Sequence, residues 1–248
     1  MSEWKDRVYA SYMSNGFADA HNMEKEFELH SRYFKKNYLK YMPKAKDKSI
    51  LDLGCGMGQF LYFCQKYGYK NCVGIDVSEE NIDYINKKEK VQVYNASIMD
   101  FLKDKEDCYD VIVLNDVIEH LTKDEIFDVL DAVMRAMKIG GVFFVKTPNM
   151  ANPFVSTAGR YIDITHEVGF TEKSMKQALR ATGFENIQII GTDIYVLNPI
   201  ISVIAKVVSK INNLFLYIMS ALYGRTSLKI FEKDILAIAY KAGEEHEL

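Results

Sequence analysis

The sequence has little of what marks secreted, metal-clustered or nucleic-acid-binding proteins. Its four cysteines, at 55, 64, 72 and 108, form no Cys-x-x-Cys pair and have no metal-like spacing to histidine, so we expect reduced thiols. A net charge of −3 with interspersed lysines and acids leaves no basic footprint for nucleic acid. No apolar signal core follows Met1, and no repeats are present. These absences predict a cytoplasmic protein.

A glycine-rich turn is the strongest local feature that is present. Ile50, Leu51 and Leu53 around Asp52 indicate a short buried strand, and three glycines follow at every second position: Gly54, Gly56 and Gly58. Glycine can adopt positive φ and lets backbone N–H groups approach a ligand closely. Apolar residues at helical spacing from 60 to 67 then predict a helix that ends near Gly68. The turn therefore lies between a strand end and a helix N-terminus.

An acid follows this turn at an informative distance. The apolar run from Val73 ends in Asp76, about twenty residues beyond the glycines. Doubly wound folds place the carboxylate that holds a ribose diol at this point. Together the turn and the acid indicate an adenosine-type ligand. The alternative is a glycine turn and a chance acid in a generic α/β protein.

Residues 51–58 together with Asp76 resemble motifs I and II of the class I S-adenosylmethionine-dependent methyltransferases. Residues 109–121 resemble the fourth-strand motif of this family, and residues 137–141 are similar to its turn before strand five. The resemblance covers roughly residues 48–148. It implies an α/β, doubly wound, Rossmann-like sheet of seven strands in the order 3-2-1-4-5-7-6, with strand seven antiparallel. It also implies S-adenosyl-L-methionine as cofactor and S-adenosyl-L-homocysteine as product.

The resemblance also implies a set of cofactor-binding positions. Asn95 stands where the family commonly has aspartate, which leaves the adenine contact to Ala96 and Ser97. The expected cofactor residues are Asp52, Gly54, Cys55, Gly56, Gly58, Asp76, Val77, Ala96, Ser97, Asn115, Asp116 and Tyr12. Tyr12 belongs to a segment, residues 9–12, similar to the N-terminal part of methyltransferases from bacterial surface-polysaccharide clusters (O-antigen or capsule). The alternative is that these tyrosines pack a helix onto the sheet edge.

The length of 248 residues favours one domain with additions. We expect an N-terminal helical cover over residues 1–47, with helices at about 3–13 and 19–42, and a methyltransferase domain over 48–248. Thr122 and Glu125 form a capping box for a helix predicted to end at Gly140-Gly141, before a strand over 142–145. Thr171 caps a helix that stops at Gly183. Residues 186–190 and 234–241 are the predicted last two strands.

Residues 194–230 form an apolar insertion between those two strands. Asn198 and Pro199 are an N-cap and N1 pair, and isoleucines, valines and phenylalanine then recur on one broad face. Lys206 and Lys210 lie on the polar stripe. No uncharged run reaches roughly eighteen residues, so an amphipathic helix or helical hairpin is favoured over a spanning one. It could contact the inner membrane face peripherally, form a homodimer through 199–223, or cap the domain.

Methyl transfer to a hydroxyl benefits from a general base, and histidine is the usual one near neutral pH. His21, His30 and His246 lie in charge-dense segments, where solvated surface positions are expected. His166 has Asp163 and Glu167 nearby to orient it. The run from Asp163 to Thr171 closely resembles a motif after strand five in the surface-polysaccharide methyltransferases. That resemblance implies His166 as base, with a structural or substrate-positioning role as the alternative.

His120, beside Glu119, is the second candidate. The pair resembles one in quinone-ring O-methyltransferases, which allows a role facing substrate or metal; the alternative is a hydrogen-bonded histidine at a helix entry. One Glu-His pair is too few ligands to predict a metal site. Three functions stay open: O-methylation of a sugar hydroxyl in a surface glycan or its precursor, O-methylation of a quinone or other small lipid-soluble acceptor, and a non-catalytic S-adenosylmethionine-binding module.

Overall fold

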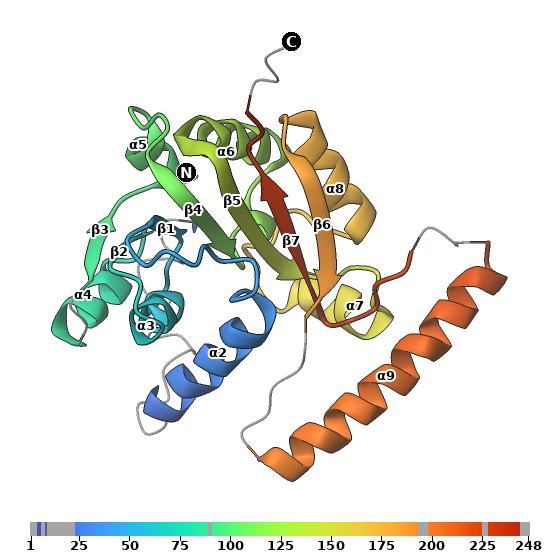
Figure 1. The fold of residues 1–248 in the computed structure, drawn as a ribbon. Helices are drawn as coiled ribbons and strands as arrows, with labels where there is room; N and C mark the ends of the chain where they lie inside the picture. The colour runs from blue at the N-terminus through green and yellow to red at the C-terminus, as the bar shows by residue number, and fades with distance from the viewer. Residues whose placement is uncertain are drawn as a thin grey trace.

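The computed structural model describes residues 4–5, 8, 23–88, 91–192, 198–224 and 228–243. Within them a single seven-stranded sheet has helices on both faces (Figure 1). The strand order β3-β2-β1-β4-β5-β7-β6 confirms the prediction. β7 pairs antiparallel with both β5 and β6, whereas the pairs among β1 to β5 are parallel. The strands are β1 (Ser49–Leu53), β2 (Asn71–Asp76), β3 (Gln92–Asn95), β4 (Tyr109–Asn115), β5 (Met137–Pro148), β6 (Glu185–Gly191) and β7 (Asp234–Tyr240).

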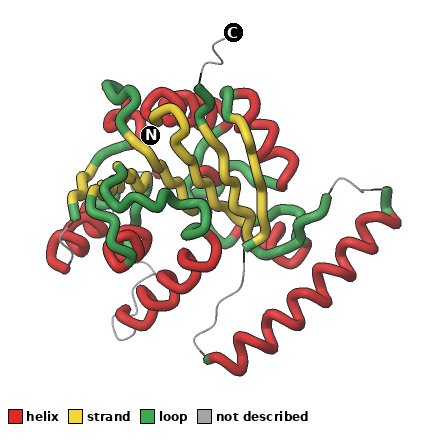
Figure 2. Tube along the Cα trace, viewed as in Figure 1, coloured by secondary structure: helices red, strands yellow, loops and turns green. Residues whose placement is uncertain are grey.

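The helices follow the expected alternation with the strands (Figure 2). Both predicted caps form: the Thr122 side chain accepts from the backbone N–H of Glu125, and the Thr171 side chain accepts from that of Ser174. The helices are α2 (Met23–Asn37), α3 (Gln59–Lys66), α4 (Glu79–Lys88), α5 (Ile98–Leu102), the short 3-10 helix η1 (Ile118–His120), α6 (Lys123–Ala136), α7 (Pro153–Tyr161), α8 (Glu172–Ala181) and α9 (Pro199–Leu222).

The core consists of two apolar layers, one on each face of the sheet. Leu51 and Ile112 pack in the layer with α6 and α8, whereas Ile50, Val111 and Phe144 pack in the layer with α2 and α3. Neighbouring residues of one strand point to opposite faces. The central strands therefore carry apolar residues on both faces, as expected for a sheet covered on both sides, with Asp52 as the buried polar exception in β1.

The predicted end of the helix after Thr122 was wrong. α6 ends at Ala136 and not at Gly140-Gly141, because Met137 already pairs with Tyr109 as the first residue of β5. The register between β4 and β5 shifts after this pair, and Gly140, at φ +74°, lies in the irregularity. Its backbone N–H donates to the Lys241 carbonyl over 2.8 Å. The two glycines therefore accommodate an irregular strand and do not terminate the helix.

Other boundaries also differ from the predictions. The helix expected over 19–42 occupies only 23–37 in the described residues, and 38–42 form turns before Pro43. α7 was not predicted; it lies where a loop was expected after β5. Most of the helix expected at 3–13, and Tyr12 with it, falls outside the described residues.

α9 is one continuous helix of 24 residues and not a helical hairpin. Asn198 caps it as predicted, accepting from the backbone N–H groups of Ile200 and Ile201. It extends away from the layered body of the molecule (Figure 1). Among the described residues, it alone is long and apolar enough, by length and composition, to cross a membrane.

Candidate active site

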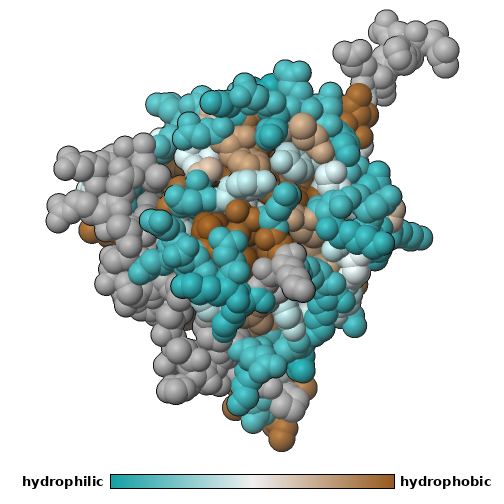
Figure 3. Space-filling model, turned by 90° about the vertical axis from the view of Figure 1, so that its left-hand side faces the viewer, coloured by the Kyte–Doolittle hydropathy of each residue, from teal (hydrophilic) through white to brown (hydrophobic). Residues whose placement is uncertain are grey.

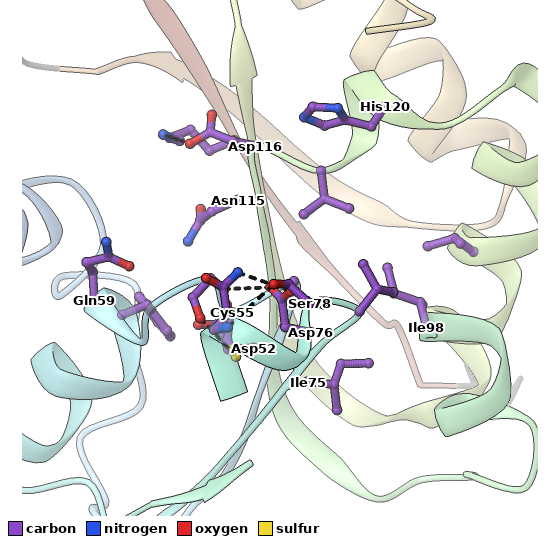
Figure 4. A pocket seen from close by; sticks show the side chains of 18 of the residues that line it. Asp52, Cys55, Gln59, Ile75, Asp76, Ser78, Ile98, Asn115, Asp116 and His120 are labelled. Atoms are coloured by element: carbon purple, nitrogen blue, oxygen red, sulfur yellow. Dashed lines mark hydrogen bonds and ion pairs between the residues drawn. The ribbon is translucent and has the colours of Figure 1, made fainter. Parts of the chain in front are cut away.

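A cavity of about 490 Å³ opens at the carboxyl edge of the parallel strands, beside the glycine turn (Figure 4). Small-molecule and cofactor sites usually have this size. Gly58, in contrast, is absent from the lining and packs towards Ile85. Ten of the predicted cofactor residues line the cavity: Asp52, Gly54, Cys55, Gly56, Asp76, Val77, Ala96, Ser97, Asn115 and Asp116.

The glycine turn has the backbone conformation that its sequence predicts. Gly54, Gly56 and Gly58 have φ values of +71°, +53° and +88°. A Cβ on Gly54 would lie 2.5 Å from a methyl carbon of Val117, so a side chain there would collide with the residue that follows Asp116. Glycine is therefore required at this position both by backbone conformation and by close packing.

Asp76 ties the turn to the following helix. Its Oδ2 accepts from the Gly56 backbone N–H over 2.8 Å, and its Oδ1 accepts from the Ser78 N–H at the same distance and from the Asn81 amide at 3.3 Å (Figure 4). Burial raises the pKa of Asp76, while these hydrogen bonds oppose the rise. The carboxylate thus has a fixed orientation at the cavity wall.

Asp52 lies deeper in the same wall and is only 2% exposed. Burial, together with the neighbouring Asp76 carboxylate, raises the pKa of Asp52 to about 8. A bound sulfonium or ammonium group would lower this pKa again, because an opposite charge favours the carboxylate. The cofactor end of the cavity is therefore electrostatically suited to a cation.

Two contacts complete the middle of the cavity. The Tyr38 hydroxyl, from the turn after α2, donates to Asn115 Oδ1 over 2.6 Å, which leaves the amide hydrogens of Asn115 as donors. Asp116 has a left-handed φ of +53° and forms an ion pair with Lys146. Burial disfavours the Lys146 ammonium, but Asp116, Tyr33 and Asp234 hold its pKa above its ordinary value.

His120 lies across the cavity from Asp52 (Figure 4). Its Nδ1 is 2.6 Å from the Thr165 hydroxyl, which itself donates to Asp163 Oδ1 over 2.6 Å. Because a hydroxyl has one proton and a carboxylate only accepts, Nδ1 of His120 must be the donor to Thr165. This assigns the lone pair of the ring to Nε2. Burial, together with nearby His166, lowers the pKa of His120 to about 4, so the imidazole is neutral at pH 7.

His166 lies directly behind His120 and is not among the lining residues. The two ring centroids are 4.6 Å apart, and His166 Nδ1 is 2.6 Å from the Gly159 carbonyl. The loop carrying Asp163 and His166 is held against η1, because the backbone N–H of Glu167 donates to the Glu119 carbonyl over 2.7 Å. Lys5 reinforces this contact by donating to the His120 carbonyl and pairing with Glu167. The fold thus brings both predicted histidines and Asp163 together.

Glu119 is buried beside this pair and accepts from the Thr147 hydroxyl over 3.1 Å. Burial, and then the nearby Asp116, raise the pKa of Glu119 to about 8. One ligand atom each from Glu119, His120 and His166 lie within 4.8 Å of one another, so these three could hold a metal ion. The sequence offered only two of these ligands as neighbours, since His166 arrives through the fold.

Several lining residues were missed from the sequence. His30, expected at a solvated surface, lines the cavity from α2, and its Nδ1–H donates to the Glu26 carbonyl. Tyr38, which is fully buried and donates to the lining residue Asn115, was also missed, since no local pattern distinguishes it from other tyrosines. Ser97, expected at adenine, uses its side chain to cap α5, accepting from the backbone N–H of Asp100. The remaining unpredicted lining is mostly apolar: Phe34, Phe60, Ile98, Met99, Val117, Leu121 and Val129.

The sheet order, the glycine turn and the acid at the end of β2 define a class I S-adenosylmethionine-dependent methyltransferase with a Rossmann-like fold. The profile of one family, described as a methyltransferase domain, matches residues 21–189. The chain belongs to this methyltransferase-domain family, and S-adenosylmethionine is its cofactor.

Curated relatives share the methyltransferase region at modest identity. A "Ubiquinone biosynthesis O-methyltransferase" of Hydrogenovibrio crunogenus is 28% identical over 117 residues, covering 45% of this chain and 47% of the relative. A protein of the same name from Bartonella quintana is 29% identical over 120 residues, covering 47% of each. The matched segments therefore span less than half of these relatives.

Solved structures share the fold. A SAM-dependent methyltransferase from Archaeoglobus fulgidus has a TM-score of 0.65 at 21% identity, covering 90% of this chain and all of that one. Phosphoethanolamine N-methyltransferase 2 of Haemonchus contortus, solved with S-adenosyl-L-methionine, has a TM-score of 0.58 at 13% identity, covering 95% and 60%. At these identities the likeness concerns the fold alone.

Proposed function

We propose that this enzyme transfers the methyl group of S-adenosylmethionine to a ring hydroxyl of a quinone-type or other small lipid-soluble acceptor. The observation that carries the proposal is His120, neutral and held by Thr165 on the cavity wall away from the glycine turn. The relatives named for ubiquinone biosynthesis and the apolar residues Val117, Leu121 and Val129 on the same wall support an aromatic acceptor.

In this mechanism the cofactor lies along the glycine turn. Of the residues that line the cavity, Asp76 would accept from the ribose hydroxyls, Ala96 and Ser97 would contact adenine, and Asn115 and Asp116 would lie between cofactor and acceptor. Asp52 becomes ionised when the cationic sulfonium binds, because the positive charge favours the carboxylate form. The cavity then excludes water from the line between acceptor oxygen and methyl carbon, which is where an in-line displacement gains its rate.

His120 takes the acceptor proton in the reaction. The acceptor oxygen forms a bond to the methyl carbon as the carbon–sulfur bond breaks, and the hydroxyl proton moves to Nε2 of His120. The positive charge of the sulfonium is thereby transferred to the imidazole, and S-adenosylhomocysteine leaves as a neutral thioether. Thr165 and Asp163 are positioning residues, since they fix the Nδ1–H tautomer and do not receive the proton.

The acidity of the acceptor favours a phenol over a sugar. Burial makes the imidazole of His120 a weak base, and a phenol, whose pKa is near 10, gives up its proton more readily than a sugar hydroxyl, which is a much weaker acid. We therefore rank the ring hydroxyl first, and we assign to His166 the role of holding His120 in place.

O-methylation of a sugar hydroxyl in a bacterial surface glycan, or in its lipid-linked precursor, is the second candidate. The run from Asp163 to Thr171, which resembles the surface-polysaccharide enzymes, favours it, and there His166 would be the base. A non-catalytic cofactor-binding module is the third. In either enzymatic case we propose a cytoplasmic protein that acts at the inner membrane face or as a homodimer through 199–223.

Transfer of label from the methyl group of S-adenosylmethionine separates these candidates. The acceptors are a catechol and a hydroxyquinol with short alkyl tails, a set of nucleotide sugars, and a glycan extract. We expect label in the two phenols. Label in sugars alone would favour the second candidate, and tight cofactor binding without any transfer would favour the third.

Thr165→Val tests the positioning role with almost unchanged side-chain volume. It removes the oxygen that accepts from His120 Nδ1, so the ring loses its preferred tautomer. We expect kcat to fall about tenfold with KM for cofactor unchanged, and the pH–rate profile to shift, since one positioned hydrogen bond is worth about 1 kcal/mol or more. Thr165→Ser keeps the hydroxyl and should restore both.

A further inference from the structure

α9 exposes its apolar side chains more than its polar ones, which is the reverse of an ordinary surface helix. Its large apolar side chains point outwards: Ile200 is 71% exposed, Ile211 65% and Leu222 75%. The polar Ser202 and Asn213 are, in contrast, only half-exposed. A helix that capped the domain would bury its apolar side. The domain therefore leaves the apolar side of α9 to another environment.

The width of the apolar side of α9 distinguishes a second copy of this chain from a lipid surface as its binding partner. At 100° per residue, the exposed apolar positions between Ile200 and Leu222 cover about 200° of the helix circumference. A second helix, as in a dimer of this chain, would cover a stripe of roughly 100°. Such a dimer would leave about half of the apolar surface in water. Lipid acyl chains and headgroups, in contrast, can surround the whole arc.

The charges of α9 also favour a lipid surface over a second copy of this chain. The helix contains Lys206 and Lys210 but no aspartate or glutamate between residues 199 and 222. Two copies packed through α9 would therefore bring together cations without acids on the helix to pair with them. An anionic lipid surface offers the complementary charge.

α7 and the residues that follow it also expose large apolar side chains. Phe154 and Tyr161 of α7 are 71% and 78% exposed, and Ile162 and Ile164 after it are 82% and 79% exposed. α7 follows β5, whose last residue, Pro148, pairs with Asp234, the first residue of β7. α9 precedes that first residue in the chain. The two apolar elements thus leave the sheet at one edge, which is also the edge of the cavity.

The connections of α9 exclude a transmembrane path despite its length of about 36 Å. On one side, Thr192 is bonded to Asp234 in the sheet. On the other, the Lys229 N–H donates to Glu172 and the Phe231 carbonyl accepts from Asn152. Residues 193–198 and 223–228 therefore connect the helix to the body, and six extended residues reach only roughly 21 Å. Both helix ends must stay on the body's side of a hydrocarbon core about 30 Å thick.

We propose that α9 lies in the plane of a phospholipid bilayer surface that contains anionic lipid, with the exposed side chains of α7 as a second contact. On the side of α4 and β3, in contrast, the coloured part of the surface is mostly hydrophilic, with apolar residues at its centre and at a few places along its rim (Figure 3). Docking through α7 and α9 places the carboxyl edge of the sheet, and with it the cavity, towards the lipid. This attachment does not depend on whether the acceptor is a phenol or a lipid-linked sugar.

Flotation with vesicles tests the attachment, using the full chain without any acceptor. We expect the protein to float with phosphatidylcholine vesicles that contain about a third phosphatidylglycerol, and less with phosphatidylcholine alone. Replacing Ile204, Ile211 and Phe215 by serine should lower partitioning at least tenfold, while Phe154→Ser with Ile162→Ser should lower it severalfold. The matched control replaces the polar residues Ser202, Ser209 and Asn213 by alanine, and it should float like the parent.

Tryptophan fluorescence tests the in-plane orientation without removing apolar residues. Trp4 is the only tryptophan, so a Trp4→Phe background carries single replacements Ile204→Trp, Ile211→Trp or Ile218→Trp, which lie seven residues apart on one side of the helix. A helix in the plane predicts equal quenching of all three by lipids brominated near the headgroup. A spanning helix predicts that Ile211→Trp alone is quenched best by lipids brominated near the chain end.

Four results would overturn the proposal. They are absence of flotation with both vesicle types, unequal depths for the three tryptophans, equal flotation of the triple-serine variant, and a dimer in sedimentation that the triple-serine variant dissociates and vesicles do not. Because cofactor affinity is measured in parallel, a loss of attachment is distinguishable from a loss of the methyltransferase site. If the triple-serine variant fails to fold, the tryptophan series still decides the outcome.

Discussion

The two ends of the cavity are built in different ways. At the cofactor end, Gly56 and Asp76 are 20 residues apart; Gly56 lies in the turn after β1, and Asp76 is the last residue of β2 in the same β-turn-α-β unit. At the acceptor end, His120 and Thr165 are 45 residues apart and come from a 3-10 turn and a loop beyond α7. The first site follows from local strand, turn and helix formation. The second exists only after β5, α7 and the loop at 163–168 have packed against η1.

The largest expected effect separates the two ends directly. His120→Ala removes the proposed base and should lower kcat about 10²- to 10⁴-fold. Affinity for S-adenosylmethionine should stay within about twofold, because His120 lies at the other end of the cavity. Single-turnover rates and calorimetry measure the two quantities. His166→Ala is the control, with a smaller loss; a larger loss for His166→Ala would make that residue the base.

The reverse experiment addresses the cofactor end. Asp76→Ala should weaken S-adenosylmethionine binding by at least about tenfold in calorimetry, because a charge-assisted hydrogen bond is worth roughly 1.5–3 kcal/mol. Asp76→Asn retains one acceptor oxygen for the Gly56 or Ser78 N–H and should lose less. Unchanged affinity in the alanine variant would show that the ribose binds elsewhere.

Asp52 gives the cofactor end a pH dependence of stability. Its pKa of about 8 in the fold lies above the ordinary value of 3.8, so the folded state binds more protons between these values. The free energy of unfolding should therefore fall as pH rises towards 8, by up to about 1.4 kcal/mol per pH unit. Urea unfolding at pH 5.5, 6.5 and 7.5 measures the slope.

Asp52→Asn should flatten this slope, and Glu119→Gln should flatten it further, because the pKa of Glu119 is also raised to about 8. Asp76 and Asp234, whose pKa values burial also raises, retain the rest of the slope. A slope that is identical in all three proteins would mean that both acids are ionised in the folded state.

Metal removal is expected to have the smallest effect. The ligand atoms of Glu119, His120 and His166 lie within 4.8 Å of one another, but the proposed mechanism needs the imidazole lone pair of His120 for the acceptor proton, and a bound ion would occupy that lone pair. We expect turnover to stay within about twofold after dialysis against EDTA. A loss of more than tenfold that one divalent ion restores would assign the three residues to a metal.

The sequence predicts the sheet well because its signals are local. The apolar runs of β1, β4 and β5, the positive φ of Gly54 and the caps at Thr122 and Thr171 all depend on residues within a few positions. The prediction failed at Gly140, since the pairing of Met137 with Tyr109 and of Gly140 with Lys241 depends on strands far away in the chain. Long-range pairing there overrides the helical pattern that extends to Met137.

The acceptor end of the cavity was harder to predict from the sequence, because it also depends on contacts between residues far apart in the chain. His120, His166 and Asp163 could each be named from residue type and resemblance, but Thr165, which links two of them, has no sequence signal of its own. His30 reaches the cavity, and Tyr38 reaches the side chain of Asn115, because α2 packs on the sheet beside α3, a contact that local patterns do not encode. Of the two remaining predicted cofactor positions, Gly58 lies off the cavity lining and Tyr12 falls outside the described residues.

The pairing of β6 with β7 has a consequence for how this chain can change. The Thr192 backbone N–H donates to the Asp234 carbonyl, so these two residues close a loop that includes all of α9. Chain-closure entropy grows only with the logarithm of loop length, so this loop costs about 2 kcal/mol more than a four-residue turn. The pairing of β6 with β7 therefore tolerates replacement of the segment that connects them. A methyltransferase of this design can acquire or lose a targeting segment there without altering one residue of its cofactor site.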